Sequence, residues 1–389
     1  MQTLLAALTL GALALAAWHH AAWPLLLSRI ARRQAPSPVP LVESALPAIT
    51  LVMPAYNEAA FIARKLRNLA ALDYPKDRLL VILACDGCTD GTVAIAEATL
   101  QEPDCAGLRA EIRDLRPNRG KLGVLNELIG ALPPGIVALS DISAMLPPDA
   151  LRRAAAHFAD PRLGAVGGTY VLERAGSAGE AKYWQYQVAV KRGEAALGAP
   201  LGLHGAFWAF RREAWSPLPP DTINDDFLWP AHMAERGWRI AYDETIRTRE
   251  AEVADAGLDA RRRRRIAAGN AQQLWRARGL LHPRHGGIAL AFLSGKALRV
   301  VMPFLLLAAA LGTLALVPVS NFFLFLAICE AFCVLLAACG WLLGSRAPKP
   351  LAILNYLVTG HLASAIGVAR YLLFRPRQPW RRAADTAPA

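Results

Sequence analysis

The chain has 389 residues, of which 54% are hydrophobic, and its formal net charge is +12. This length allows one catalytic domain of about 200–250 residues together with membrane segments. A positive net charge is compatible with nucleic-acid binding, but its location argues against it, because the arginines gather beside apolar stretches rather than on an aromatic-studded face. Basic residues beside apolar spans are what the positive-inside rule expects on the cytoplasmic side of a membrane.

Residues 1–34 predict an N-terminal transmembrane anchor. The apolar run over residues 4–28 has no positive charge before it, and arginines rather than a small-residue cleavage site follow it. An uncleaved anchor therefore fits better than a signal peptide. His19 and His20 lie within the run, and we expect them near a membrane interface. Residues 35–48 are rich in proline and predict a linker.

Residues 49–250 predict an α/β domain, because short apolar segments alternate with segments of helical periodicity. Strands are expected at 49–53, 79–85, 110–113 and 136–140, and helices at 58–71, 90–100 and 121–131. Such alternation indicates a mostly parallel sheet with helices on both faces.

A polar cluster follows three of these strands. The clusters are residues 54–58 (PAYNE), 86–90 (DGCTD) and 141–143 (DIS). Ligands of such sheets bind beyond the carboxyl ends of the strands. Asp, Asn and Gly are common in any loop, so one cluster alone is weak evidence. Three clusters in register at strand ends indicate a binding site.

With these motifs the sequence resembles the family 2 glycosyltransferases, which have the GT-A fold. The resemblance covers roughly residues 48–275 and depends on the order of its motifs. These are the three clusters above, N-R-G-K-L-G-V-L-N at 118–126 and N-D-D at 224–226. It implies an inverting enzyme that moves a sugar from a nucleotide-diphosphate donor, expected to be a UDP-sugar. The apolar flanks resemble those of members that build polysaccharides or glycolipids, which implies a lipid-linked acceptor.

The resemblance also implies which residues bind the donor. Asp86 would accept hydrogen bonds from the base, and Tyr56 and Glu58 would flank the nucleoside, with Pro54 in the same set. Lys121 is expected near the phosphates. Its alternative is a solvated lysine at the start of a helix.

Asp141 corresponds to the family's carboxylate that helps to hold Mg²⁺ or Mn²⁺ against the diphosphate. Such hard ions take oxygen ligands and often keep waters. The family often has Asp-x-Asp here, whereas Ser143 stands at the third position of this chain. A neutral hydroxyl is a weak ligand, so the second protein contact of the metal stays open.

Asp226 is the expected general base, because it matches the last carboxylate of the family's Thr-Glu-Asp motif. It would take a proton from the acceptor hydroxyl, and Asp225 would position Asp226 or the acceptor. The alternative is that both acids stabilise the start of a helix expected at 227–236. The two roles are compatible.

Residues 202–210 (GLHGAFWAF) resemble the family's acceptor-side strand and loop. Gly205 would let the backbone approach a sugar, and Phe207 and Trp208 would stack on sugar rings. The alternative is that the two aromatic residues are core residues of an alternating strand.

Residues 251–295 predict an arginine-rich, membrane-proximal segment. Arg262 and Arg265 lie three residues apart and would share one helix face. They would clamp the diphosphate or face lipid headgroups. The Gln-x-x-Arg-Trp motif of processive synthases is absent from this segment. Its absence favours the addition of a single sugar over processive polymerisation.

Residues 296–375 predict two or three transmembrane helices. The stretches 296–317 and 321–343 are long enough to cross about 30 Å of hydrocarbon. The stretch 351–374 either spans or lies in the interface, and its length slightly favours a span. Residues 376–389 form a basic tail. The arginines beside the apolar spans place the catalytic domain in the cytoplasm, at a bacterial inner membrane.

Two other functions remain as alternatives. One is a processive polysaccharide synthase or a glycosyltransferase that acts on a simple lipid. The other is an inactive membrane scaffold with a retained nucleotide fold. The joint presence of Asp86, Asp141 and Asp226 argues against the scaffold, because a scaffold needs none of them.

Overall fold

The computed structural model describes residues 1–32, 38, 41–172, 178–251 and 256–374. Parts of the predicted linker and all of the predicted basic tail therefore lie outside the described residues. The chain divides into two compact units. The sheet unit contains Arg33–Arg174 and Lys191–Val253. The helical unit contains Met1–Arg32, Ala175–Val190 and Ala254–Pro376.

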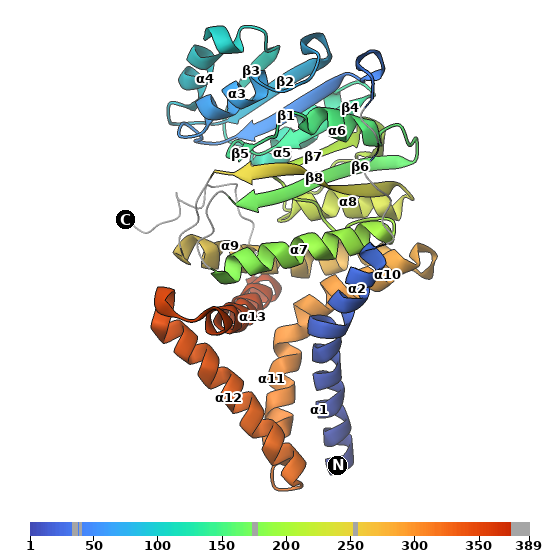
Figure 1. The fold of residues 1–389 in the computed structure, drawn as a ribbon, viewed down its shortest axis with the longest axis vertical. Coiled ribbons are helices and arrows are strands. Elements are labelled where there is room, and N and C mark those ends of the chain that lie inside the picture. Colours follow the sequence, from blue (N-terminus) through green and yellow to red (C-terminus); the bar gives the residue numbers. More distant parts are fainter. Residues whose placement is uncertain (33–37, 39–40, 173–177, 252–255, 375–389) are drawn as a thin grey trace. The chain divides into compact units, whose positions relative to one another are not determined.

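The described strands of the sheet unit form one mixed sheet in the order β3-β2-β1-β4-β7-β6-β8-β5 (Figure 1). The strands are β1 (Ile49–Ala55), β2 (Leu79–Asp86), β3 (Ala110–Leu115), β4 (Ile136–Ser140), β5 (Ala144–Met145), β6 (Leu163–Leu172), β7 (Phe207–Arg211) and β8 (Arg239–Glu250). Strands β3, β2, β1 and β4 are parallel neighbours, as are β6 and β8. β7 runs antiparallel to β4 and β6, and β5 to β8. The mostly parallel sheet predicted from the sequence is confirmed.

Helices connect most of these strands. They are α3 (Ile62–Ala70), α4 (Thr92–Leu100), α5 (Lys121–Ala131), α6 (Ala150–His157), α7 (Ala178–Ala196) and α8 (Asp225–Glu235). Almost every residue of β1 and β2 is buried, as expected for parallel strands covered on both faces. The core lies between these strands and the apolar faces of α3, α4 and α6.

The helix expected at 58–71 begins at Ile62. Its predicted first residues are held in a loop instead. The backbone N–H of Glu58 donates to the Thr92 hydroxyl over 2.7 Å, and that of Ala59 donates to Asp90 over 3.1 Å. These contacts come from a distant segment, so helical periodicity alone does not reveal them.

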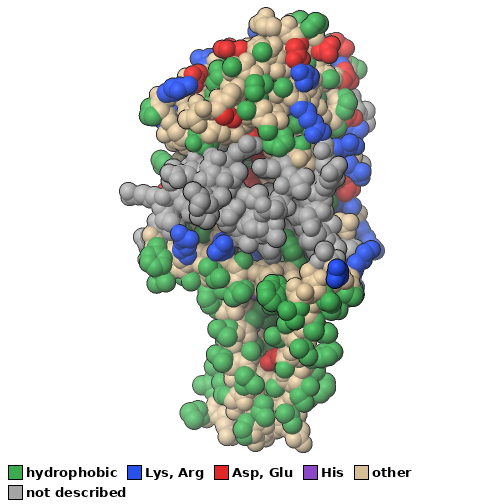
Figure 2. Space-filling model, turned by 90° about the vertical axis from the view of Figure 1, so that its left-hand side faces the viewer, with side chains coloured by type: hydrophobic (Ala, Val, Ile, Leu, Met, Phe, Trp, Pro, Cys, Tyr) green, Lys and Arg blue, Asp and Glu red, His purple; other side chains and the backbone are tan. Residues whose placement is uncertain are grey.

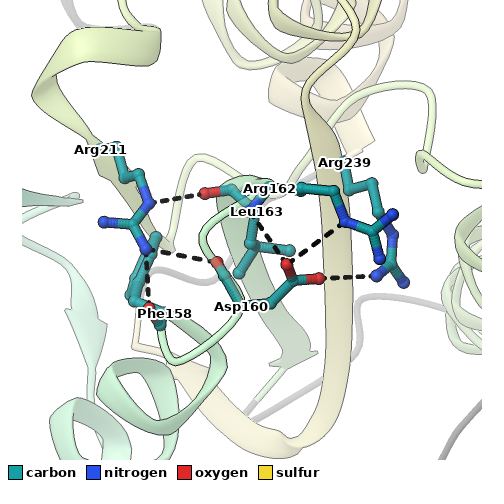
Figure 3. A network of polar contacts seen from close by, with 6 residues as sticks. All are labelled: Phe158, Asp160, Arg162, Leu163, Arg211 and Arg239. Carbon is teal, nitrogen blue, oxygen red and sulfur yellow. Dashed lines mark hydrogen bonds and ion pairs between the residues drawn. The ribbon is translucent and has the colours of Figure 1, made fainter.

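A polar network ties three segments together at the edge of the sheet where β4 begins (Figure 3). The guanidinium of Arg211, at the end of β7, donates to the carbonyl oxygens of Phe158, Asp160 and Leu163 over 2.7–3.2 Å. The Asp160 carboxylate accepts from Arg239 over 2.7 Å. This network stabilises the edge opposite the carboxyl ends of β1, β2 and β4.

The helical unit contains the other described α-helices. They are α1 (Gln2–Ala17), α2 (Trp23–Ala31), α9 (Ala256–Arg276), α10 (Gly287–Ala291), α11 (Leu298–Leu316), α12 (Asn321–Leu343) and α13 (Lys349–Phe374). Two π-helical segments continue them, η1 (Trp18–Ala22) between α1 and α2 and η8 (Phe292–Ala297) between α10 and α11. η1 and η8 pack against each other, as do α1 and α11.

Among the residues that the structure describes, four helical stretches are long and apolar enough to cross a membrane: Gln2–Ala31, Gly287–Leu316, Asn321–Leu343 and Lys349–Phe374. Figure 2 shows hydrophobic side chains spread over the surface of this part of the helical unit. α1 and α11 approach closely, since a Cβ added at Gly312 would lie 2.1 Å from the Thr9 hydroxyl. α13 lies across α11 and packs on α9 (Figure 1). The length of α13 fits a span, whereas this crossing favours a position in the interface.

We predict that Arg211→Met lowers the free energy of unfolding of the sheet unit by about 1–3 kcal/mol, because it leaves carbonyl groups without their donor. Arg162→Met is the matched control. Its exposed guanidinium makes only a 3.7 Å ion pair with Asp160, and such pairs contribute little. Unfolding of both variants in detergent, followed by circular dichroism, measures the difference. Equal stability of the two variants would contradict the proposed role of Arg211.

Candidate active site

The loops that follow β1, β2 and β4 meet at one edge of the sheet. Ala55 pairs with Cys85 at the ends of β1 and β2, and β1 pairs in parallel with β4. The three polar clusters identified in the sequence therefore lie along the same edge, as parallel strands require.

Asn57 connects the first two loops. Its backbone has a φ of 53°, an uncommon value for a residue with a side chain. Its amide oxygen accepts from the Thr89 N–H over 2.8 Å, and its amide nitrogen donates to the Thr89 hydroxyl over 3.1 Å. Tyr56 and Glu58, on either side of Asn57, are half-buried. Pro54 lies within β1 and is buried, so it supports the loop from behind.

Asp86 anchors the N-R-G segment. Its carboxylate accepts from the backbone N–H groups of Arg119 and Gly120 over 2.9 and 2.7 Å. The Asn118 amide donates to the Asp86 carbonyl oxygen over 2.9 Å. Asp86 is fully buried, so these contacts fix the turn into α5 and the position of Lys121. Its predicted contact with a nucleotide base stays a prediction.

Gly87 explains how the two loops pack so closely. Its φ is +68°, and an added Cβ would lie 2.8 Å from the Asn118 nitrogen. A side chain here would be strained by its backbone conformation and would also push the N-R-G segment away.

Lys121 is the centre of a cluster of three carboxylates. Its ammonium lies 3.5 Å from an oxygen of Asp141, in the loop after β4, and 3.4 Å from an oxygen of Asp225 on α8. Burial lowers the pKa of Lys121, but Asp141, Asp225 and Asp226 together outweigh burial and hold it above the usual lysine value. The structure therefore brings Lys121 together with all three predicted metal and catalytic acids.

Asp225 and Asp226 are the first two residues of α8, after Asn224 in the N-cap position. Carboxylates are stabilised there by the helix dipole, so the helix-start alternative and a catalytic role are compatible in this fold. The Asp226 carbonyl oxygen accepts from the Leu203 N–H over 2.8 Å. This bond connects the start of α8 to the loop before β7.

The loop before β7 passes close to Asp141. A Cβ added at Gly205 would lie 3.2 Å from a carboxylate oxygen of Asp141, so glycine keeps this space open. Two buried residues of α7 hold the loop from the other side. Lys191 donates to the Gly202 carbonyl oxygen, and Glu194 accepts from the Leu201 N–H over 2.8 Å.

The two predicted sugar-stacking aromatics lie in the core. Phe207 and Trp208 are 1% and 2% exposed. Trp208 stacks on Phe210 with ring centroids 4.6 Å apart, and its ring lies 6.0 Å from that of Trp229. Of the two roles considered from the sequence, this burial corresponds to packing in the core. We therefore do not include Phe207 and Trp208 among the residues proposed to contact the acceptor.

Arg262 and Arg265 both lie in α9 of the helical unit. The Arg262 side chain is outside the described part of the structure, and Arg265 is exposed. Their predicted contact with diphosphate or headgroups stays a prediction.

Lys65 is a residue that the motifs did not identify. It is fully buried on α3, where its amino group donates to the Ser140 hydroxyl over 2.7 Å and to the Ala144 carbonyl oxygen. These two acceptors lie on either side of residues 141–143, so Lys65 supports the Asp141 loop from behind. Its position three residues after Ile62 and four before Leu69, on the buried face of α3, is the signal that the sequence contained.

Burial lowers the pKa of Lys65 to about 7, against the opposing influence of Asp141 and Glu250. A neutral amine still has two N–H donors. Both bonds to the Asp141 loop therefore persist whether or not Lys65 is protonated.

The described residues fit a divalent cation only in part. No group of three or more His, Cys, Asp or Glu side chains among them is arranged to hold a metal ion. Asp141 has a side chain 41% exposed at the loop tip, so it can offer oxygen to a cation whose other ligands come from phosphates and water. This is how proteins commonly bind Mg²⁺.

A family model described as "Glycosyltransferase like family 2" matches residues 47–269. The beta-monoglucosyldiacylglycerol synthase of Synechocystis sp. is 37% identical over 120 residues, which are 31% of this chain and 25% of that protein. The poly-beta-1,6-N-acetyl-D-glucosamine synthase of Staphylococcus aureus is 29% identical over 208 residues, 51% of this chain and 48% of that protein. The chain thus spans about half or less of the length of these curated relatives.

A solved structure is similar over a larger part of the chain. It is a mannosyltransferase from Pyrobaculum calidifontis in complex with GDP-Man and Mn²⁺, with a TM-score of 0.70 and 26% identity. The similarity covers 92% of this chain and 99% of that chain, so it extends beyond the sheet unit.

We predict that Lys65→Met weakens Mn²⁺ binding roughly tenfold in the presence of a nucleoside diphosphate, because it removes both bonds that hold the Asp141 loop. Lys76→Met is the matched control. Lys76 also donates to two backbone carbonyls, those of Ala70 and Leu72, but at the far end of α3. Isothermal titration calorimetry on both folded variants measures the effect. Unchanged Mn²⁺ affinity in Lys65→Met would rule out this role.

Proposed function

Because this chain belongs to glycosyltransferase family 2, we propose that it moves one sugar from a nucleoside-diphosphate donor to a lipid-linked acceptor, with inversion at the anomeric carbon. The acceptor would serve exopolysaccharide or other cell-surface glycan synthesis. The observation that carries the proposal is the cluster of Lys121 with Asp141 and Asp225, in which the loop after β4 and the first turn of α8 direct carboxylates to one ammonium.

The proposed reaction is a single displacement. Asp226 accepts the proton of the acceptor hydroxyl while that oxygen bonds to the anomeric carbon. The bond from the anomeric carbon to the diphosphate oxygen breaks on the opposite face, and the nucleoside diphosphate leaves with the electron pair. Configuration inverts, and no covalent enzyme intermediate forms. Asp225 holds its place beside Asp226 through its contact with Lys121.

Lys121 places positive charge where the leaving diphosphate needs it. Its ammonium lies between Asp141 and Asp225, so it can turn toward a phosphate without leaving the cluster. We propose that Asp141 holds Mg²⁺ or Mn²⁺, which when bound would act as a Lewis acid toward the diphosphate. The Mn²⁺ in the complex of the similar mannosyltransferase supports this assignment.

The donor base and sugar are tested together. The sequence resemblance favours a UDP-sugar, and the GDP-Man of the similar mannosyltransferase makes a GDP-sugar the alternative. Purified full-length protein in detergent, supplied with lipid extract and a panel of UDP- and GDP-sugars, should release nucleotide with one of them. Absence of release with every donor and extract would overturn the proposed activity.

We also propose that residues 1–34 and 296–375 hold the protein in the membrane and that residues 49–250 face the cytoplasm. Arg29 and Arg32 at the end of the first span, and the arginines of 251–295, support this orientation. Cys105 is buried, so a thiol probe needs a new site. Asp104→Cys, at an exposed neighbour, should resist an impermeant thiol reagent in intact cells and react after lysis.

We predict that Asp226→Asn lowers the transfer rate about a hundredfold or more, because an amide cannot accept the proton. Donor binding should stay close to that of the wild type. Asp221→Asn, an exposed acid shortly before α8, is the matched control and should keep its rate. Steady-state rates and nucleotide affinity decide the outcome. Normal turnover in Asp226→Asn would remove this residue from the mechanism.

We predict a single addition for each acceptor. The segment that aligns with the processive motif has no aromatic residue until Trp275. Few spanning helices also leave little protein to enclose a polar polymer, whose hydroxyls cannot face lipid. Excess donor with limiting lipid acceptor, followed by mass spectrometry, should show one added sugar. A ladder of long chains would instead establish the processive alternative. The similarity to the poly-beta-1,6-N-acetyl-D-glucosamine synthase of Staphylococcus aureus is the reason to test for it.

A further inference from the structure

Polar side chains gather where the two π-helical segments of the helical unit meet. η1 contributes Trp18, His19 and His20, and η8 contributes Ser294. The Trp18 indole donates to the Ser294 hydroxyl over 3.1 Å, and His19 Nδ1 lies 2.8 Å from the Ser294 carbonyl oxygen. π-helical turns inside α-helices are frequent at functional sites, and here two of them pack against each other.

A third helix adds to this cluster. The ring of His361, on α13, lies edge-on to that of His20 with centroids 5.0 Å apart. His20 is likewise edge-on to His19 at 4.8 Å. Arg299, at the start of α11, lies within electrostatic range of all three imidazoles. We call these residues, His19, His20, Ser294, Arg299 and His361, the histidine cluster.

The cluster contains a polar atom that the protein does not satisfy. Nε2 of His361 is buried and has no hydrogen-bond partner. A buried polar atom without a partner costs free energy, and more so where water is excluded. This position is therefore suited to a polar group supplied by another molecule.

Charge indicates the chemistry of that group. The spans that form the cluster, residues 2–31, 287–316 and 349–374, contain no Asp or Glu, while Arg299 and Lys296 are basic. No described group of side chains is arranged to bind a metal ion. An anion with several acceptor oxygens matches a guanidinium and imidazole N–H donors.

The expected depth of the histidine cluster in the membrane indicates which molecule supplies this anion. Residues 2–19 form a helical rise of about 27 Å, close to the thickness of the hydrocarbon core. The histidine pair lies within the apolar run over residues 4–28 and precedes Arg29 and Arg32, and we expect it near a membrane interface. α11 starts at the same level, because η1 packs on η8. In the orientation proposed above, and with α13 in the interface, we expect the cluster near the phosphates of the inner leaflet.

We propose that the histidine cluster is a binding site for a lipid phosphate. Arg299 and an N–H of His361 bind the phosphate oxygens, and the apolar surfaces of α1 and α11 receive the acyl or prenyl chains. This site is separate from the Asp141 cluster, and its level in the membrane rests on the orientation proposed above. Its ligand is either a phospholipid of the leaflet or the lipid phosphate of the sugar acceptor.

Native mass spectrometry of the full-length protein in detergent tests the proposal. The probes are dioleoyl phosphatidylglycerol, undecaprenyl phosphate and phosphate-free dioleoylglycerol. Wild type should retain one phosphate lipid in preference to dioleoylglycerol. Arg299→Gln and His361→Phe should raise the apparent Kd roughly tenfold or more, since each removes a donor to a charged group. Equal retention of dioleoylglycerol, or unchanged Kd in both variants, would overturn the proposal.

Matched controls isolate the cluster. Arg346→Gln removes the same charge, and His285→Phe the same ring, elsewhere in the helical unit, and both should bind lipid as wild type does. His361→Gln, which keeps an N–H donor, should restore part of the affinity and guards against misfolding. Displacement of phosphatidylglycerol by undecaprenyl phosphate would identify the acceptor as the source, and its failure would identify leaflet phospholipid. Asp226→Asn should bind lipid normally, which separates this site from the proposed catalysis.

Discussion

The position of one ammonium among three carboxylates organises the candidate active site. Lys121 is the first residue of α5, directly after the turn that buried Asp86 fixes. Asp141 reaches it from the loop after β4, and Asp225 from the first turn of α8. Three elements far apart in the chain are therefore held together by charge. The cluster also concentrates negative charge at a sheet edge, which prepares the site for a cation that arrives with a diphosphate.

Buried lysines hold the two loops that border this cluster. Lys65 donates to acceptors on either side of the Asp141 loop, and Lys191 donates to the Gly202 carbonyl in the loop before β7. Burying an ammonium is costly unless it is hydrogen-bonded. In both cases the amino group is bonded to a loop carbonyl, so the cost is offset by contacts that fix loop geometry. The geometry of the site therefore depends on these buried lysines as well as on the residues that line it.

The sequence predicted the elements whose signals are local. β4 and α5 have the predicted bounds, Ile136–Ser140 and Lys121–Ala131, because an apolar run and a helical period identify them directly. The proximity of Lys121 and Asp141 follows from strand order, since the segments after parallel strands share an edge. Asp225 comes from the first turn of α8, after the antiparallel β7, and strand order does not predict its contact with Lys121. The helix start at Ile62 was missed, because contacts from Asp90 and Thr92 hold the preceding residues in a loop.

Other features depend on distant packing that a single sequence does not display. Whether Phe207 and Trp208 face a sugar or the core was undecided, because both outcomes share one alternating pattern, and packing against Phe210 and Trp229 places them inside. His20 and His361 are 341 positions apart, so neither could be paired in advance. The sequence shows that Lys65 lies on an apolar helix face, but it does not show that Ser140 and Ala144 accept its hydrogen bonds.

The central claim is that Asp141 holds a cation only together with the donor's diphosphate. Electron paramagnetic resonance of Mn²⁺ titrated with full-length protein, with and without UDP or GDP, tests it directly. The account predicts little binding to the protein alone, one bound Mn²⁺ per chain with the matching nucleotide, and loss of that binding in Asp141→Asn. Tight binding without nucleotide, or nucleotide-dependent binding that survives Asp141→Asn, would contradict it.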